Sequence, residues 1–194
     1  MGRLRTIIVN WSNMVQYSSE WVAHHRLRKA VFIDKAGWEM PVCDGLEFDQ
    51  YDTAYSNYVI VLNEKNECVG CARMMPTNVR IGLHTYMIKD ACDGKLDGIP
   101  SGILDIEPPV DGHEWEATRY TIDPNVGMKD AKLIMDEILI SMKEFARSKD
   151  ITRFIGLMPT GVYRMFKRAG HEVDIIGPVI DIDNRKTAVA YMPV

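Results

Sequence analysis

The sequence contains no apolar run that approaches the roughly 20 residues of a membrane-spanning helix. Its N-terminal segment, MGRLRTIIVNWSN, also lacks the long apolar stretch and the small-residue cleavage site of a secretory signal. Positive charge is in deficit too, because the net charge is −4, which argues against a general nucleic-acid-binding protein. We therefore expect a cytoplasmic protein that neither spans a membrane nor binds nucleic acid.

Cysteine is scarce, with only four residues: Cys43, Cys68, Cys71 and Cys92. Cys68 and Cys71 form a CxxC pair in ECVGCARMM, a segment with the pattern of a β-strand. Residues three apart on a regular strand point to opposite faces, so we expect these two thiols to diverge. No second CxxC accompanies them, which favours buried, reduced thiols over a zinc site.

Several catalytic motifs are also missing. No GxGxxG follows a predicted strand, and there is no P-loop and no GxSxG nucleophile elbow. The five histidines have no metal-ligand spacing, so we expect no metal site. The pyrophosphate loop of ordinary acetyltransferases, Q/R-x-x-G-x-G/A, is absent, since only Gly127 stands where it would lie. A site for plain acetyl-CoA is therefore poorly supported.

The composition is that of a soluble globular chain, with 46% hydrophobic and 26% charged residues in 194. Because no linker separates two composition regimes, residues 1–194 are predicted to form a single domain. Hydrophobic periodicity and turn residues predict the elements. Strands are expected at 5–11, 58–62, 67–75, 115–123, 152–158, 173–182 and 187–192, and helices at 17–36, 129–148 and 161–169. Residues 39–56 are expected to form a long ordered loop, and 77–114 show no clear period.

The alternation of these elements predicts an α/β fold, a three-layer α-β-α sandwich with a mixed central sheet. The unit from 115 to 158 has the order strand, helix, strand, and is expected to bring two strands together in parallel. This arrangement resembles the GCN5-related N-acetyltransferase fold. In that fold, the pantetheine arm of a thioester lies between two central parallel strands.

Charged and aromatic residues are unusually dense in the first two thirds of the chain. They form five groups: Arg28-x-x-x-Phe32, Gly37-Trp38, Glu47-x-Asp49-x-x-Asp52, Gly70-Cys71-x-Arg73-x-x-Pro76-Thr77 and Trp115-Glu116-x-x-Arg119. In this order and at close to this spacing, they resemble the LuxI-type autoinducer synthases, which make acyl-homoserine lactones. The resemblance covers most of residues 5–125 and continues more weakly beyond.

The resemblance implies a reaction. The α-amine of S-adenosylmethionine attacks an acyl thioester, the methionine carboxylate then displaces the sulfonium, and an N-acyl-homoserine lactone leaves with methylthioadenosine. S-adenosylmethionine is thus a substrate rather than a cofactor. The acyl donor is expected to be either acyl-CoA or an acyl carrier protein. The reaction calls for no metal.

The S-adenosylmethionine site is expected at Arg28, Phe32, Trp38, Asp49 and Asp52. The two aromatic rings offer apolar and π surface to the adenosine and the cation, and the two acids place negative charge beside it. Arg73 and Arg119 are expected to pair with these acids, and one of the arginines to hold the methionine carboxylate. Taken singly, each residue also has a purely structural interpretation, as core or as an ion pair.

Glu116 is predicted to orient the amine or to accept its proton through a water molecule. On a regular strand, however, Glu116 and Arg119 would face opposite sides. Both residues reach one site only if the strand has a bulge, which we predict between Trp115 and Tyr120.

The second half is expected to hold the acyl group and its carrier. Candidates for an adaptable acyl pocket are Met135, Met142, Leu157 and Met158. Candidates for contact with an acidic carrier protein or with CoA phosphates are Lys143, Arg147, Arg164, Lys167 and Arg168. The same basic residues are also compatible with a solvated helix face.

Two features depart from the family pattern. The segment NVRIGLHTYMIKDACDGKLDGIPSG looks rearranged, with Tyr86 as its nearest aromatic. Gly156 stands where some family members have a hydroxyl residue that favours 3-oxo chains, which points to an unsubstituted or unusual acyl group. Two alternatives to lactone synthesis remain open at this stage. One is an acyltransferase of the same fold that acts on another small amine, and the other is a non-catalytic binding module.

Overall fold

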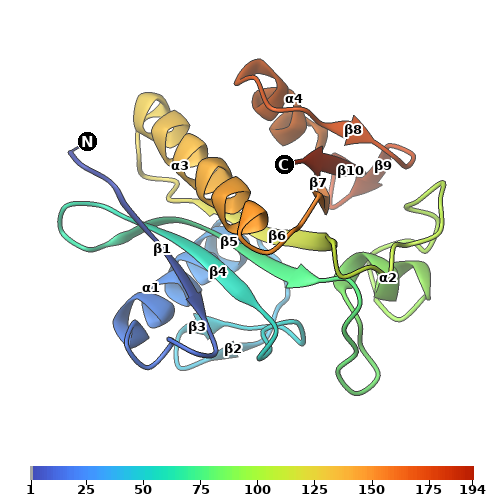
Figure 1. Cartoon of the computed structure of the whole chain (residues 1–194), viewed down its shortest axis with the longest axis horizontal. Coiled ribbons are helices and arrows are strands. Elements are labelled where there is room, and N and C mark those ends of the chain that lie inside the picture. The colour runs from blue at the N-terminus through green and yellow to red at the C-terminus, as the bar shows by residue number, and fades with distance from the viewer. Residues whose placement is uncertain (1) are drawn as a thin grey trace. The chain divides into compact units, whose positions relative to one another are not determined.

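The computed structural model describes residues 2–194 (Figure 1). Its strands are β1 (Arg5–Asn10), β2 (Val42–Cys43), β3 (Leu46–Glu47), β4 (Asn57–Leu62), β5 (Cys68–Pro76), β6 (Glu114–Ile122), β7 (Arg153–Pro159), β8 (Asp174–Ile175), β9 (Ile180–Ile182) and β10 (Arg185–Pro193). Its α-helices are α1 (Ser18–Arg28), α2 (Met87–Cys92), α3 (Met128–Arg147) and α4 (Thr160–Arg168). A π-helical segment, Lys29–Lys35, continues α1.

The chain forms two compact units. Unit 1 comprises Met1–Met74 and Arg119–Phe145, and unit 2 comprises Met75–Thr118 and Ala146–Val194. Strands β5 and β6 each have residues in both units. Each unit is described below by itself, and the single domain over 1–194 stays a prediction.

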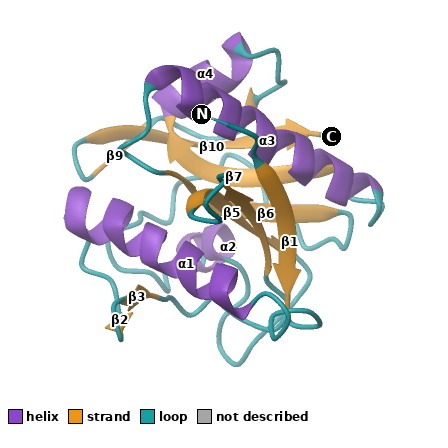
Figure 2. Ribbon diagram, turned by 90° about the vertical axis from the view of Figure 1, so that its left-hand side faces the viewer, coloured by secondary structure: helices purple, strands orange, loops and turns teal. Residues whose placement is uncertain are grey.

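Unit 1 has a layered structure of its own. Strands β1, β4 and β5 form consecutive antiparallel pairs, with Val9 opposite Tyr58 and Val59 opposite Ala72. One face of this sheet packs against α1, where Trp21 contacts the cluster around Tyr58 and Ile60. In Figures 1 and 2, α1 and α3 lie on opposite faces of these strands. The α-β-α layering expected from the sequence is therefore present within this unit.

Gly70 explains why α3 can lie close to β5. A Cβ at this position would collide with Ile134 of α3 and lie 3.1 Å from the Cδ1 atom of Ile138. Both isoleucines are fully buried and belong to the apolar face that predicts this helix. The glycine is thus required by packing, not by an unusual backbone angle.

Gly70→Ala is therefore expected to destabilise the protein by about 1–3 kcal/mol, because the added methyl group overpacks the α3 interface. Urea unfolding measures this change. Gly102→Ala is the control, since nothing lies within 4 Å of the methyl group it would add. Equal unfolding midpoints for the two variants would contradict the packing argument.

The prediction that the Cys68 and Cys71 thiols diverge is wrong. The β4–β5 register shifts, with Val61 opposite Gly70 but Leu62 opposite Cys68, so Val69 is an extra residue in β5. This bulge cancels the usual alternation and brings the two side chains to the same side. The pKa of the Cys68 thiol is raised by its hydrogen bond with Cys71 and by burial. All four cysteines are free thiols, of which Cys71 is buried and Cys43 exposed.

Unit 2 contains a mixed sheet. Strand β6 pairs in parallel with β7 from Glu114 opposite Arg153 to Glu116 opposite Ile155, as the strand–helix–strand order predicts. Strand β7 pairs antiparallel with β10, which also pairs with β8 and β9. Helix α4 packs on this sheet, where the Tyr163 hydroxyl donates a 2.5 Å hydrogen bond to the Gly156 carbonyl. Gly170, with φ +91°, ends the helix as expected.

Three predicted segments differ in detail. The loop expected at 39–56 contains a small hairpin, β2–β3. The strand expected at 173–182 is divided into β8 and β9, because Gly177 lies against the carbonyl of Ile103 and Pro178 has no backbone N–H. Residues 77–114 contain the short helix α2, which directly follows the buried Tyr86. No helix within 2–194 is both long and apolar enough to cross a membrane.

Candidate active site

The end of α1 places three of the predicted residues. Arg28 is the last residue of the α-helix, and Phe32 lies in the π-helical segment that follows. The Trp38 amide donates to the Phe32 carbonyl at 2.9 Å, and Gly37 ends the segment with φ +74°. The wide π-helical turn therefore returns the chain so that Trp38 lies beside Phe32. Single π-helical turns of this kind are frequent at functional sites.

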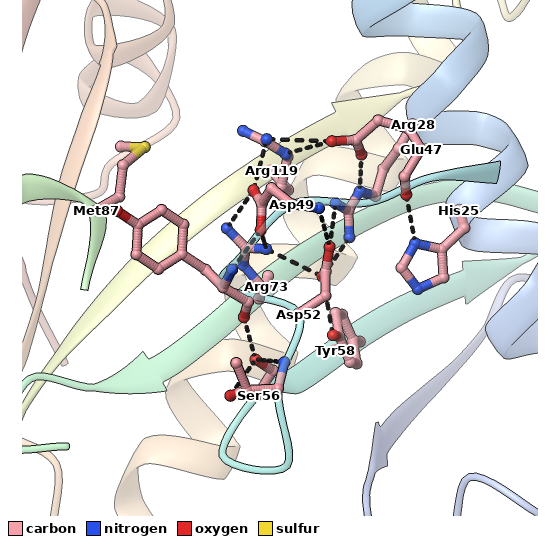
Figure 3. Close-up of polar contacts among 12 residues, drawn as sticks. His25, Arg28, Glu47, Asp49, Asp52, Ser56, Tyr58, Arg73, Met87 and Arg119 are labelled. Carbon is pink, nitrogen blue, oxygen red and sulfur yellow. Dashed lines mark hydrogen bonds and ion pairs between the residues drawn. The ribbon is translucent and has the colours of Figure 1, made fainter. Parts of the chain in front are cut away.

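Arg28 is bonded on two sides (Figure 3). Its Nε donates to Glu47 Oε2 at 2.5 Å, and its two Nη atoms donate to the two oxygens of Asp52, each at 2.8 Å. Arg73 of β5 forms a similar fork with Asp49, at 2.5 and 3.0 Å, and a further 3.0 Å bond with Asp52. Such bidentate pairs fix both partners in position.

Arg119 completes this ion-pair network. Its Nη2 lies 2.6 Å from Asp49 Oδ2 and 3.1 Å from Glu47 Oε1, and its Nε donates to the same Glu47 oxygen at 3.2 Å. Three arginines thus face three carboxylates, all within unit 1: Arg28, Arg73 and Arg119 with Glu47, Asp49 and Asp52. Arg119 is the most exposed of the three arginines, at 8% of its side chain, and its Nη1 makes none of these bonds.

Burial of these charges is offset by their mutual attraction. Burial opposes the ionisation of Asp52, but Arg73 and Arg28 hold its pKa well below the usual range. Burial likewise opposes the charge on Arg28, yet its bonds with Asp52 raise the pKa of the guanidinium. In Arg119 burial prevails over the attraction of Asp49, and the pKa is lowered. These ion pairs therefore favour the charged forms of Arg28 and Asp52.

Arg119 has an irregular backbone within strand β6, which continues past it to Ile122. Its backbone has φ +53°, a left-handed conformation that is uncommon for a residue with a side chain. The change falls between Trp115 and Tyr120, where the sequence predicts a bulge. The bulge itself, and with it a shared side for Glu116 and Arg119, stays a prediction.

Phe32 and Trp38 form a parallel stack, with ring centroids 4.9 Å apart and planes 13° from parallel. The guanidinium carbon of Arg119 lies 5.3 Å from the Phe32 ring centroid. Neither aromatic side chain is fully buried. The structure thus brings together all the residues that the sequence predicts for S-adenosylmethionine, together with Arg73 and Arg119.

Glu116 lies in unit 2, where it is fully buried. Its two carboxylate oxygens accept hydrogen bonds from the backbone N–H groups of Met87, at 3.1 Å, and Ile88, at 2.8 Å. These are N–H groups at the start of α2, which have no partner within the helix. Glu116 therefore anchors α2, a structural role that the sequence did not indicate. Its proposed role towards the amine stays a prediction.

The residues predicted for the acyl side are divided between the two units. Met135 and Met142 are buried on α3 in unit 1, and Met158 is buried and Leu157 half-buried on β7 in unit 2. Of the basic residues, Lys143 is half-buried, and Arg147, Arg164, Lys167 and Arg168 are exposed. On α4 the basic residues are exposed, whereas Tyr163 and Phe166 are buried. No group of three or more metal-binding side chains occurs among residues 2–194.

Known proteins resemble the chain over nearly its whole length. The family model described as autoinducer synthase matches residues 12–194. The chain belongs to the autoinducer synthase family. The acyl-homoserine-lactone synthase of Pseudomonas aeruginosa strain PAO1 is 31% identical over 163 residues, which cover 81% of this chain and 74% of that protein.

Solved structures agree with the fold. The CoA-dependent acyl-homoserine lactone synthase BjaI, solved with S-adenosylmethionine and isopentyl-CoA, has a TM-score of 0.80 at 23% identity, covering 99% of this chain and 84% of that one. A putative N-acetyltransferase from Lactobacillus plantarum has a TM-score of 0.61 at 16% identity and covers both chains fully. These likenesses confirm the α/β fold, with a mixed sheet of the N-acetyltransferase type.

Two members of the site in this autoinducer synthase were not assigned from the sequence. Glu47 is named in the Glu47-x-Asp49-x-x-Asp52 group but is given no role there, although it bridges Arg28 and Arg119. Its position two residues before Asp49 was the available signal. Tyr58, whose hydroxyl donates to Asp52 at 2.9 Å, had the pattern of an ordinary strand residue and carried no such signal.

His24 and His25 of α1 are expected to make this family member less stable in acid. Both side chains are fully buried, and burial lowers the pKa of His25 to about 4 and lowers that of His24 well below its usual value. An unfolded histidine has a pKa of about 6.5. The stability from keeping the His25 ring neutral is therefore complete above about pH 6.5 and lost as the pH falls towards about 4, and the lowered pKa of His24 acts in the same direction.

For His25 this loss is on the order of 3 kcal/mol by pH 4. Urea unfolding of the wild type at pH 7.5 and pH 4.5 is expected to show it, with a lower midpoint in acid. His24→Phe removes one of the two titrating rings and is expected to have a weaker pH dependence. A midpoint that changes equally with pH in both proteins would count against the buried histidines as the cause.

Proposed function

We propose that this chain is an N-acyl-homoserine lactone synthase for quorum-sensing signalling. The amine nitrogen of S-adenosylmethionine attacks the thioester carbonyl carbon, a C–N bond forms, and the thiol of the carrier leaves. A carboxylate oxygen of the methionine portion then attacks the carbon next to the sulfonium. The C–S bond breaks, and the acyl-homoserine lactone and methylthioadenosine are released. The observation that carries the proposal is the closed ion-pair network beside the Phe32–Trp38 stack, in a member of this family.

The features of unit 1 suit S-adenosylmethionine. The partly exposed Phe32 and Trp38 rings supply π surface for the adenine and the sulfonium. Arg119 is the arginine we assign to the methionine carboxylate, because its Nη1 is not used in the network and its side chain is the least buried of the three. Arg28, Arg73, Asp49 and Asp52 hold one another in fixed positions, so that the site is preorganised for the substrate.

The remaining roles follow the sequence. Glu116 is assigned to the amine, which it orients or deprotonates through a water molecule. The α-amino group has a pKa near 8, so the base needs to remove a proton against only about 1.4 kcal/mol at neutral pH. Met135, Met142, Leu157 and Met158 are assigned to the acyl chain. The basic residues of α3 and α4 are assigned to the acyl carrier protein or CoA. We propose action in the cytoplasm, without a metal or cofactor.

The test is incubation of the purified protein with S-adenosylmethionine and a panel of acyl-CoA and acyl-carrier-protein thioesters of varied chain length. Methylthioadenosine and acyl-homoserine lactone are expected in equal amounts, and only when both substrates are present. Acylation of a different amine without methylthioadenosine would favour a different acyltransferase. Binding of both substrates without turnover would favour a non-catalytic module.

A further inference from the structure

The buried pair His24–His25 lies directly beside the ion-pair network but contributes no charge to it. Both rings belong to an aromatic cluster on the inner face of α1, with Trp21, Phe48 and Tyr58. The His25 ring stacks on Phe48 at 4.1 Å and meets Trp21 edge-on at 4.5 Å. The His24 ring lies 4.0 Å from His25 and 4.6 Å from Tyr58. The packing of the two histidines is therefore similar.

Their hydrogen bonds are different. His25 Nδ1 lies 2.8 Å from the backbone carbonyl oxygen of Glu47 (Figure 3). A carbonyl oxygen only accepts hydrogen bonds, so His25 Nδ1 must carry the hydrogen. His25 Nε2 is buried without a hydrogen-bond partner in the described part of the chain, as are both ring nitrogens of His24. Of the two histidines, only His25 thus bonds residue 47, and it bonds the backbone, whereas Arg28 at the end of α1 bonds the Glu47 carboxylate.

The position of Glu47 affects the ion-pair network because its carboxylate joins two of the three arginines. One carboxylate oxygen accepts from Arg28 Nε, and the other accepts from Arg119 Nε and Nη2. Its main chain, however, belongs to the two-residue strand β3, which pairs only with the two-residue strand β2. The β2 side chains, Val42 and Cys43, are exposed and add little packing. The β2–β3 hairpin by itself is a weak support for such a residue.

His25 adds to the support that the Arg28–Glu47 ion pair gives, because it contacts two consecutive residues of the hairpin segment, Glu47 and Phe48. It donates to the carbonyl of Glu47 and stacks on the ring of Phe48. We propose that His25 is a positioning residue for S-adenosylmethionine: it holds the Glu47 backbone against α1, so that the Glu47 carboxylate sets the orientation of Arg119. His25 touches no substrate in this scheme. The inference rests on the proposed function only in naming the substrate that Arg119 receives.

Three variants separate the hydrogen bond from simple packing. His25→Phe keeps an aromatic ring and loses the donor. His25→Asn loses the ring but keeps an N–H donor close to the position of Nδ1. His24→Phe is the matched control, because its ring occupies the same cluster without a bond to Glu47. The measured quantities are kcat and the KM values for S-adenosylmethionine and for the acyl thioester.

His25→Phe is expected to raise the KM for S-adenosylmethionine about tenfold, the effect of one lost hydrogen bond, while the KM for the thioester changes less than about twofold. His25→Asn is expected to stay within about threefold of the wild type, and His24→Phe within about twofold. A KM raised equally by His24→Phe and His25→Phe, or raised by His25→Asn alone, would overturn the proposal and leave His25 as packing.

Hydrogen–deuterium exchange of the peptide covering residues 41–49 provides a readout that does not depend on activity. Exchange is expected to be faster in His25→Phe than in His24→Phe and the wild type. If the wild type releases no methylthioadenosine, the proposed function fails while the exchange comparison still decides whether His25 holds the hairpin. Equal exchange in all proteins would overturn the positioning role, whatever the reaction.

Discussion

Replacement of Arg73 by alanine is expected to lower the rate of methylthioadenosine release by at least about 100-fold. Arg73 bonds both Asp49 and Asp52, and these acids in turn fix Arg119 and Arg28. Without Arg73, Asp49 loses its bidentate ion pair. The side chains that are proposed to hold the substrate are then no longer fixed in position. The measurement is steady-state kinetics with S-adenosylmethionine and the best acyl thioester.

The same substitution is expected to reduce stability by about 3–5 kcal/mol, since it leaves buried carboxylates with too little positive charge. Arg73→Lys keeps the charge but loses the fork, so it should fold and show a raised KM for S-adenosylmethionine. Arg153→Ala is the matched control, because Arg153 is a more exposed strand arginine paired with Glu114 outside the network. Undiminished activity in a folded Arg73→Ala protein would show that Arg73 has a structural role only and does not position the substrate.

Replacement of Glu116 by glutamine is expected to lower kcat about 100-fold, with little change in the KM for S-adenosylmethionine. Glutamine removes the basic oxygen that the amine proton needs. It also weakens the hold on α2, because its side chain has one acceptor oxygen for the two N–H groups of Met87 and Ile88. Kinetics alone would not separate these two effects.

Asp90→Asn separates them. Asp90 is a buried residue of α2 whose carboxylate accepts from the Thr85 backbone and hydroxyl, so it fixes the start of the same helix without taking part in the proposed chemistry. Asp90→Asn is expected to lose stability and to keep most of its kcat. An equal loss of kcat in the two variants would assign Glu116 to anchoring rather than to proton transfer.

Much of the fold could be predicted from the sequence, because the local signals were strong. The β4–β5 hairpin follows from two apolar runs around Asn63–Asn66, and α3 follows from a long amphipathic period. The β5 bulge at Val69 left no such signal, since it depends on pairing with β4 and not on residue type. The Cys68–Cys71 prediction failed for that reason.

The sequence predicted which residues form the site better than it predicted how they are arranged. The charged residues stand out in the sequence, and the segment in which a bulge is predicted contains the left-handed backbone of Arg119. Which acid pairs with which arginine depends on how the π-helical turn and the β2–β3 hairpin approach β5, and no local pattern encodes that. The anchoring role of Glu116 was missed because α2 itself was not predicted.

The most direct test is a crystal structure of the protein with S-adenosylmethionine bound. We expect the adenosine against Phe32 and Trp38 and the methionine carboxylate bonded to Arg119, with the Arg28–Asp52 and Arg73–Asp49 pairs still intact. Density for the ligand away from these rings and arginines would contradict the central claim that the unit 1 network is the amine-substrate site.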